Sequence, residues 1–248
     1  MKTVLTAESL RKQYAVDGDI ITAVSNISFE LRVGEFIAIV GPSGSGKTTL
    51  LAMIAGLLTP TSGRVILAGN DLSLLNDKQL TALRRQRIGF TFQAHNLVPF
   101  LDAQQNVELM LRLNGRPSKD GRVRAKELLN SLGLGDRLNN LPSQLSAGQR
   151  QRVAIARSLI HEPDLVLADE PTASLDTSLA YQVVKTFADL IHKQKRAGIM
   201  VTHDLRMCRF VDRVIQIVDG QIIQSTSDCS ELEALAVVEL PDNLSESR

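Results

Sequence analysis

The stretch GEFIAIVGPSGSGKTT, residues 34–49, decides the fold that this sequence predicts. Its first half is a continuous apolar run that ends in glycine, which is typical of a strand buried on both faces of a sheet. Its second half matches the pattern G-x-x-x-x-G-K-[ST], and a helix is expected over residues 47–56. A buried strand, a glycine-rich loop and a helix in this order predict a phosphate-binding loop in an α/β protein.

The chemistry of this loop suits a nucleoside triphosphate. Its glycines let backbone amides converge on phosphate oxygens without a Cβ in the way, and the helix N-terminus adds its positive dipole end. Lys47 would reach the β- and γ-phosphates, and the Thr48 hydroxyl would ligate Mg²⁺. The predicted ATP-binding residues of the loop are Gly41, Pro42, Ser43, Gly44, Ser45, Gly46, Lys47, Thr48 and Thr49.

Further along the chain, polar residues follow three more apolar strands. LVLADE (165–170) ends in two carboxylates that point to opposite sides, so Asp169 suits the outer coordination sphere of Mg²⁺ and Glu170 suits polarising the attacking water. His203 follows GIMVT, and we expect it to contact the γ-phosphate and position Glu170 or the water. Gln93 ends IGFTF and is expected to touch Mg²⁺ or the water. Ligands bind at the carboxyl edge of such sheets, so we predict Lys47, Glu170 and His203 as catalytic.

The rest of the pattern predicts one domain with an insertion. Strands are expected at 3–10, 20–31, 64–68, 87–92, 164–168, 198–202, 213–218 and 221–225. Residues 94–160 lack a strand pattern and read as helices at 102–114, 119–132 and 147–161. We therefore predict an α/β core with a mostly parallel sheet and N-terminal antiparallel strands over 1–93 and 161–228, an inserted helical subdomain over 94–160, and a tail over 229–248.

Composition narrows the class of protein. The 248 residues are 44% hydrophobic and 22% charged with a formal net charge of +1, which gives no bulk attraction to nucleic acid or anionic membranes. The basic stretches at 84–87 and 115–124 are interpreted as solvated helix faces and a loop. No apolar run is long enough for a membrane span, and the N-terminus lacks a signal peptide, so we expect a cytoplasmic protein. Cys208 and Cys229 have no disulfide or metal spacing, and we expect both to be reduced.

A second glycine-containing stretch, LSAGQRQRVAIARSL (145–159), opens a helix with a serine and small residues, as if its amides held an anion. Together with GPSGSGKTT, Gln93, LVLADEPTASLD and VTHD, in this order and spacing, it resembles the ATPase subunits of ABC transporters over residues 1–225. That resemblance implies ATP and Mg²⁺ as cofactors. It also implies that Ser146, Gly148 and Gln149 contact the γ-phosphate of ATP held by a second copy of the chain.

The same resemblance implies further roles. Tyr14 matches the aromatic residue that stacks on adenine, and Asp176, with Ser174 and Leu175, matches the loop that crosses the dimer interface. Ala147 stands where the family commonly has glycine. Because the implied contacts come from Ser146 and Gly148, we expect this departure to be tolerated.

The stretch FTFQAHNLVPFLDAQQNVEL (90–109) resembles the macrolide-export and lipoprotein-release type ATPases, and most closely the heterocyst-glycolipid exporters. This implies export of a lipid or other hydrophobic substrate at the cytoplasmic face of the inner membrane. The implied partners are a separate permease subunit with four transmembrane helices, a periplasmic adaptor and an outer-membrane channel. Residues 93–101 and 102–114 are expected to form the groove that receives the permease.

Two other functions share the catalytic motifs. An importer subunit serving a binding-protein-dependent permease differs only in the stretch from residue 93 to 107. A soluble ABC-type ATPase acting on DNA or ribosomes would carry two cassettes, a coiled-coil insertion or zinc motifs, and this chain has none of these and no basic face. We therefore expect no nucleic-acid partner. The transported molecule does not follow from the sequence.

Overall fold

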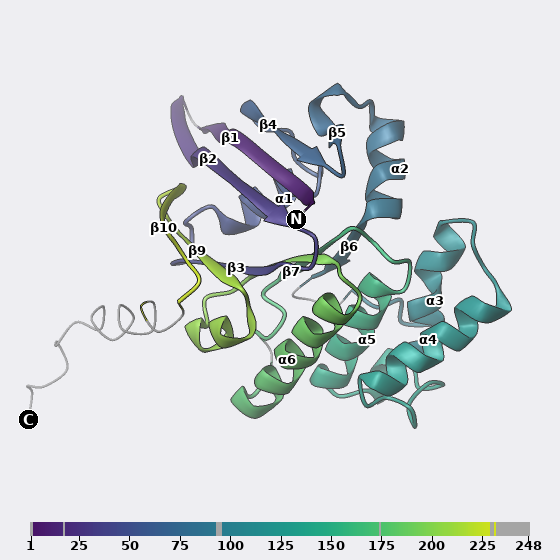
Figure 1. The fold of residues 1–248 in the computed structure, drawn as a ribbon. Coiled ribbons are helices and arrows are strands. Elements are labelled where there is room, and N and C mark those ends of the chain that lie inside the picture. Colours follow the sequence, from purple (N-terminus) through teal and green to yellow (C-terminus); the bar gives the residue numbers. More distant parts are fainter. Residues whose placement is uncertain (1, 17, 93–95, 174, 229–230, 232–248) are drawn as a thin grey trace, which may run out of the picture.

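A six-stranded sheet runs through the molecule in the order β10-β9-β3-β8-β7-β6 (Figure 1). The computed structural model describes residues 2–16, 18–92, 96–173, 175–228 and 231. β10 is antiparallel to β9, and the other neighbouring strands pair in parallel. The strands are β3 (Phe36–Val40), β6 (Ile88–Thr91), β7 (Leu165–Asp169), β8 (Ala197–Val201), β9 (Arg213–Val218) and β10 (Gln221–Thr226). This is the mostly parallel core that the sequence predicts.

The side chains of β3 alternate between two hydrophobic cores, as the pleat of a strand requires. Phe36 and Ala38 face a core shared with α5 (Ala147–Leu159) and α6 (Thr177–Lys193). Ile37 and Ile39 face a second core that includes α1 (Lys47–Ile54) and the N-terminal strands. All of β3 is buried. The apolar run that opens the deciding stretch is therefore continuous because both of its faces are covered.

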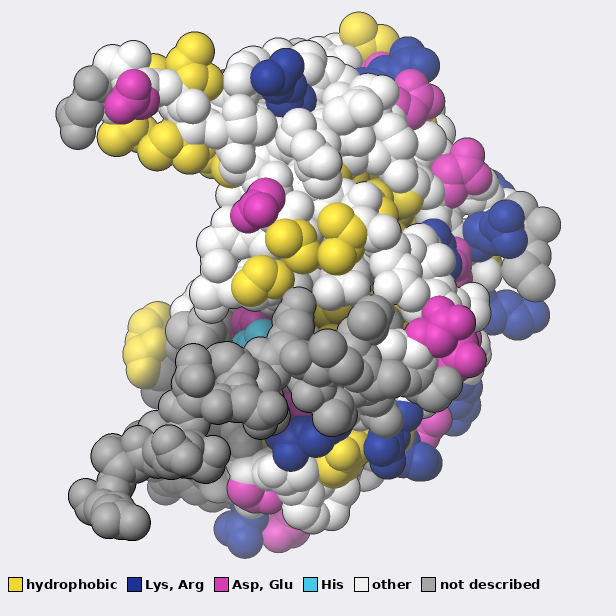
Figure 2. Space-filling view, turned by 90° about the vertical axis from the view of Figure 1, so that its left-hand side faces the viewer, with side chains coloured by type: hydrophobic (Ala, Val, Ile, Leu, Met, Phe, Trp, Pro, Cys, Tyr) yellow, Lys and Arg dark blue, Asp and Glu magenta, His cyan; other side chains and the backbone are white. Residues whose placement is uncertain are grey.

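The second core is closed by an antiparallel sheet of order β2-β1-β4-β5. Its strands are β1 (Thr3–Val16), β2 (Asp19–Arg32), β4 (Ser62–Leu67) and β5 (Asn70–Asp71). β1 is longer than the expected 3–10, since it stays paired with β2 as far as Val16. The tip of this strand pair projects from the molecule with hydrophobic side chains along one side (Figure 2). The chain then passes through η1 (Leu72–Leu74) and α2 (Asp77–Arg87) to β6.

The segment between β6 and β7 is helical, and its helices lie together at the lower right of Figure 1. It contains α3 (Ala103–Leu113), α4 (Lys119–Ser131), η2 (Pro142–Gln144) and α5, close to the three predicted helices. Asp102, Ser118 and Ser146 cap α3, α4 and α5 with side-chain hydrogen bonds. Such caps satisfy amides that the helix leaves open and fix where each helix starts.

The remaining short helix, η3 (Leu205–Phe210), joins β8 to β9. None of the helices in the described ranges combines the length and hydrophobicity needed to cross a bilayer. Of the predicted tail, only residue 231 belongs to the described part of the chain.

Candidate active site

The glycine-rich loop leaves the carboxyl end of β3 and enters α1. Gly46 occupies the N-cap of α1, with φ of 93° and no side-chain capping hydrogen bond, so the first amides of the helix have no side chain over them. A Cβ on Gly46 would lie 2.1 Å from the carbonyl oxygen of Ala23, and one on Gly41 would lie 2.0 Å from that of Ile217. A Cβ on Gly44 would meet nothing within 4 Å. Two of the glycines are therefore needed where the loop packs on β2 and β9, and the third lies beside open space.

Lys47 lies inside this loop and is almost fully buried. Its Nζ donates hydrogen bonds to the carbonyl oxygens of Gly41 and Pro42, at 2.8 and 2.7 Å. Burial lowers the pKa of Lys47, while the charges of Glu170 and Asp169 act in the opposite direction. The ammonium group is thus held at the centre of the loop within the field of two carboxylates, and phosphate oxygens would compensate its charge better than carbonyls do.

Thr48 and Asp169 bring the start of α1 and the end of β7 together. The hydroxyl of Thr48 donates to Oδ1 of Asp169 at 3.5 Å, the long end of the hydrogen-bond range. Burial raises the pKa of Asp169, and the neighbouring charge of Glu170 raises it further. Across the described ranges, no group of three His, Cys, Asp or Glu side chains is placed to hold a metal ion. A cation here would take its other ligands from phosphate and water, which is the usual pattern for Mg²⁺.

Glu170 follows directly but faces a different partner. Its backbone has a φ of 47°, and its amide donates to the carbonyl oxygen of Val201 at 2.9 Å. Its Oε1 lies 3.0 Å from Nδ1 of His203, which follows β8 and is two-thirds exposed. Its Oε2 is buried and has no hydrogen-bond partner among the residues that the structure describes. The two carboxylates have different partners, since Asp169 contacts Thr48 while Glu170 contacts His203.

The surroundings of Oε2 of Glu170 show whether these residues suit a reacting water. An unsatisfied buried carboxylate oxygen is costly, and such groups persist where a ligand or water completes them. Glu170 lies at the same edge of the sheet as the open side of the loop at Gly44 and the pair of Thr48 and Asp169, which can accept a cation. The residues present therefore fit a nucleoside triphosphate with a divalent cation.

The N-terminus of α5 is capped by hydrogen bonds between Ser146 and Gln149. Oγ of Ser146 accepts from the amide of Gln149 at 3.2 Å, and Oε1 of Gln149 accepts from the amide of Ser146 at 2.8 Å. Gly148 is buried, and a Cβ there would lie 2.2 Å from Cδ2 of Leu179 on α6. Within the part of the chain that the structure describes, none of these three residues bonds to the phosphate-binding loop.

Tyr14 and Asp176, two further predicted site residues, lie at different elements of the fold. Tyr14 lies within β1 rather than in a loop, is 38% exposed, and has the Nζ of Lys12 5.3 Å from its ring centroid. Asp176 caps α6 by accepting from the amide of Leu179 at 3.0 Å. The predictions for Gln93 and Ser174 lie outside the described residues.

Arg206, which was not predicted as a site residue, connects two elements of the site. Its guanidinium donates to both carboxylate oxygens of Asp204, at 2.8 and 2.7 Å, and to Oγ1 of Thr177 at 3.4 Å. These bonds connect the residue after His203 to the first turn of α6. The only signal in the sequence is an arginine two positions after an aspartate, which is too common to carry a prediction.

A half-open apolar groove of about 370 Å³ lies between α2, β6, α3 and α5. The rings of Phe90 and Phe92 stack in it at 4.1 Å, and Leu109 and Met110 of α3 line it. The α3 side agrees with the predicted groove, whereas the contribution of α2, through Arg84 and Arg85, was not predicted. Residues 93–95, also expected here, lie outside the described residues.

This fold and site define an ATPase with a phosphate-binding loop. The chain belongs to the ABC transporter family of ATP-binding subunits, whose family model matches residues 24–173. It is 48% identical over 221 residues to the lipoprotein-releasing system ATP-binding protein LolD of Hydrogenovibrio crunogenus, covering 89% of this chain and 96% of that protein. It is 45% identical over 212 residues to the macrolide export ATP-binding/permease protein MacB of Brucella melitensis, covering 85% of this chain but 33% of that protein.

Solved structures agree with this assignment. The dimeric ATP-binding cassette MJ0796, in a post-hydrolysis state bound to ADP and Pi, superposes with a TM-score of 0.82 at 39% sequence identity. The match covers 90% of this chain and 97% of that one. The chain is therefore an ATP-binding, ATP-hydrolysing subunit of an ABC transporter.

Proposed function

We propose that two copies of this chain close around two ATP molecules and thereby drive export through a separate permease at the cytoplasmic face of the inner membrane. The observation that supports a dimer concerns two turns that are expected to bind phosphate, the loop at Lys47 and the start of α5 at Ser146. Lys47, Glu170 and His203 gather at one edge of the sheet, while Ser146 caps α5 and, among the described residues, has no hydrogen bond to any of these three. A second copy would bring the turn at Ser146 to the first copy's γ-phosphate, with residues 94–160 as the arm that presents it.

The chain's own residues have distinct tasks in this mechanism. The amides of the loop and Nζ of Lys47 bind the phosphates, and Tyr14 stacks on adenine. Thr48 and Asp169, with the predicted ligand Gln93, would hold Mg²⁺, and the cation would supply neutralisation of phosphate charge. Glu170 polarises the attacking water, and His203 holds Glu170 in place through their 3.0 Å contact. Ser146, Gly148 and Gln149 of the second copy stabilise the charge that develops on the γ-phosphate, and Asp176 lies between the two sites.

Replacing Glu170 tests the catalytic assignment. Glu170→Gln keeps the size and one acceptor oxygen but loses the carboxylate charge, so we expect ATP to bind normally and hydrolysis to fall roughly 10²-fold or more. The ATP-bound dimer should then accumulate in size-exclusion chromatography with light scattering. A hydrolysis rate equal to that of the unmodified chain would remove Glu170 from its proposed role.

The groove between α2, β6 and α3 supports coupling to a permease. Its lining is mostly apolar but includes arginines, which suits a short amphipathic helix of the membrane subunit. Leu109→Glu places a charge in the groove, whereas Leu113→Glu places the same charge on an exposed position of the same helix. We expect Leu109→Glu to abolish copurification with membrane proteins while leaving the ATPase rate of the isolated chain unchanged, and Leu113→Glu to affect neither.

Export of a lipid or glycolipid, together with a periplasmic adaptor and an outer-membrane channel, is the finer proposal. It is supported by the stretch 90–109 and by the names of the relatives above. Identifying the membrane subunit that copurifies with the chain tests it. A four-helix permease with a large periplasmic domain is expected, and a permease that works with a substrate-binding protein would instead make the chain an importer subunit.

A further inference from the structure

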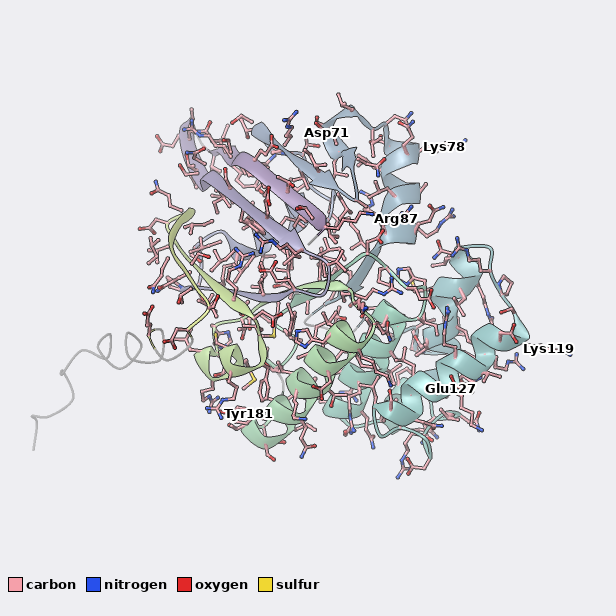
Figure 3. All side chains as sticks on the ribbon, viewed as in Figure 1. Asp71, Lys78, Arg87, Lys119, Glu127 and Tyr181 are labelled. Carbon is pink, nitrogen blue, oxygen red and sulfur yellow. The ribbon has the colours of Figure 1, made fainter. Side chains whose placement is uncertain are left out.

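A polar cavity of about 270 Å³ lies away from the catalytic edge, where α5 ends and α4 begins. It is lined by Arg116, Asp120, Arg124, His161 and Glu162, among others. Lys119, labelled in Figure 3, is the first residue of α4 and marks this corner of the molecule. The catalytic mechanism uses none of these side chains.

His161 is the central observation. Only 6% of this residue is exposed, and its Nε2 lies 3.1 Å from the carbonyl oxygen of Ile88. A carbonyl oxygen only accepts hydrogen bonds, so Nε2 carries the proton and Nδ1 of the neutral ring is an acceptor. Nδ1 is buried, and no group in the described ranges forms a hydrogen bond with it. His161 lines the cavity, and its Nδ1 is an acceptor that a donor from outside the chain could satisfy.

Cationic groups surround this ring. Burial lowers the pKa of His161, and the charges of Arg124, Arg196 and Arg116 lower it further. Arg124 donates to Oε1 of Glu162 at 2.5 Å and to the carbonyl oxygen of Ile160, yet its Nε is buried and unpartnered. Arg196 lies 3.9 Å from Glu162. Glu162 is thus neutralised by arginines, and Asp120 is the other carboxylate that lines the cavity.

The donors and the acceptor restrict the ligand. Guanidinium groups bind anionic oxygens most strongly, and the neutral Nδ1 of His161 accepts from a hydroxyl, so a ligand that carries both would satisfy these side chains together. An ionised carboxylate has no hydroxyl, and a protonated one has no charge. A phosphate monoanion has both, and phosphomonoesters take up their second proton with a pKa of about 6.

We propose that this cavity binds a singly protonated phosphate group, with Arg116 and Arg124 on its anionic oxygens and its P–OH donating to Nδ1 of His161. The group is inorganic phosphate or the headgroup of a phosphomonoester. The site lies at the end of α5 opposite Ser146, so it is separate from the site where ATP is hydrolysed.

Histidine NMR provides a direct test. The full chain, labelled with ¹⁵N-histidine and saturated with the ATP analogue AMP-PNP to fill the catalytic site, is titrated with inorganic phosphate at pH 6 and pH 8. We expect the Nδ1 resonance of His161 to shift, with binding several-fold tighter at pH 6 because the shared proton is then present. The signal is assigned by His161→Gln, or, if that variant does not fold, by elimination with variants of His95, His192 and His203.

Charge variants separate this site from nonspecific attraction. Arg116→Gln should weaken phosphate binding roughly tenfold or more. Asp120→Asn should tighten it, because a repelling carboxylate is removed. Lys126→Gln, which removes the same charge from an exposed position of α4 outside the cavity, should leave it unchanged. Equal binding by Arg116→Gln and Lys126→Gln would overturn the proposal.

Vesicles distinguish the two sources of phosphate. Phosphatidylcholine vesicles with and without phosphatidic acid, whose headgroup is a phosphomonoester, are sedimented with the same variants. Sedimentation that requires phosphatidic acid and is lost in Arg116→Gln assigns the site to a lipid headgroup. NMR binding of inorganic phosphate without such sedimentation assigns it to a soluble phosphate, and failure in both arms contradicts the site.

Discussion

At the scale of single residues, the same amino acid meets different physical demands. Gly41 and Gly46 are required because a Cβ would overlap the backbone of neighbouring strands, while Gly44 faces open space. A Cβ on Gly148 would instead meet a side chain, that of Leu179, which would have to shift. From the sequence alone, these glycines share one explanation, which is close approach to phosphate. The other explanation, overlap of a Cβ with packed neighbours, depends on contacts between segments that are distant in the sequence, so a local sequence pattern does not reveal it.

Gly148→Ala tests the contact between α5 and α6. The added Cβ would lie 2.2 Å from Leu179, so we expect a loss of about 1–3 kcal/mol in the free energy of unfolding and a displaced helix start that lowers ATPase activity. Adding Leu179→Ala should recover part of the stability lost in Gly148→Ala, measured as a double-mutant cycle by urea denaturation. Ala147→Gly, one position earlier, should change ATPase activity little. Strict additivity of the two alanine substitutions would contradict the proposed overlap.

Asp169 is predicted to trade stability for activity. Its raised pKa means that ionisation is disfavoured in the folded state, so this cost is absent below the unfolded-state pKa, grows as the pH rises from there, and is complete above the folded-state pKa. Asp169→Asn keeps an acceptor for Thr48 and removes the charge. At pH 7.5 without nucleotide, we expect a higher Tm, with a gain of about 1 kcal/mol raising it by roughly 2–4 °C.

The same variant should lose the stabilisation that Mg²⁺ with ATP gives to the unmodified chain, and turnover with it. Scanning calorimetry at pH 5 and pH 7.5, with and without Mg²⁺ and AMP-PNP, separates these effects. A Tm below that of the unmodified chain at pH 7.5 without nucleotide would show that the Asp169 carboxylate stabilises the fold.

At the scale of elements, the sequence predicts best where one element contains its own evidence. β3 has an unbroken apolar run and a glycine at its end, and the observed strand Phe36–Val40 lies inside it. α5 begins at the predicted serine, because Ser146 and Gln149 form a reciprocal cap. β1 was predicted too short, since its second half is half-exposed and lacks an apolar alternation, and pairing with β2 alone keeps it extended.

Of the site, the residues adjacent to strand ends were predicted because sheet edges collect ligands, and Asp169, Glu170 and His203 lie there. Arg206 and the α2 side of the groove were not predicted, because they matter only through contacts with segments far along the chain. Local patterns locate groups within an element, and packing decides which elements meet.

Gly89 in β6 is predicted to control how closely α5 approaches the sheet. A Cβ there would lie 2.0 Å from the carbonyl oxygen of Ser158, a backbone atom that cannot move aside. Gly89→Ala should therefore lower the free energy of unfolding by about 1–3 kcal/mol. Gly135→Ala is the matched control, since its Cβ would meet only the end of the Asn130 side chain, which can rotate away. Equal midpoints in urea denaturation for the two variants would rule out the backbone contact.

At the scale of the whole molecule, one sheet separates two cores and gathers two sets of polar groups. The carboxyl end of β7 leads to Asp169 and Glu170, while Ile88, at the start of β6, accepts from His161 beside the phosphate cavity. The helix α5 runs between Ser146 and this cavity. A rigid helix between the two locations is a physical route by which the state of one could bias the other.

The proposed sharing of each ATP site between two copies leads to a complementation experiment. Lys47→Ala removes the lysine of the phosphate-binding loop, and Ser146→Arg blocks the turn that would contact the other copy's ATP. In a background of Glu170→Gln, which prevents turnover, neither variant alone should form an ATP-dependent dimer. A mixture should do so, because one of its two sites pairs the intact loop of one chain with the intact Ser146 of the other.

The mixed dimer should contain one ATP, whereas the Glu170→Gln dimer should contain two, measured by quantifying nucleotide after size-exclusion chromatography. Affinity tags on one variant confirm that each dimer contains both chains. If Ser146 instead contacted ATP within its own chain, every chain in the mixture would carry a damaged site and the mixture would stay monomeric. The two arrangements therefore predict opposite results from the same sample.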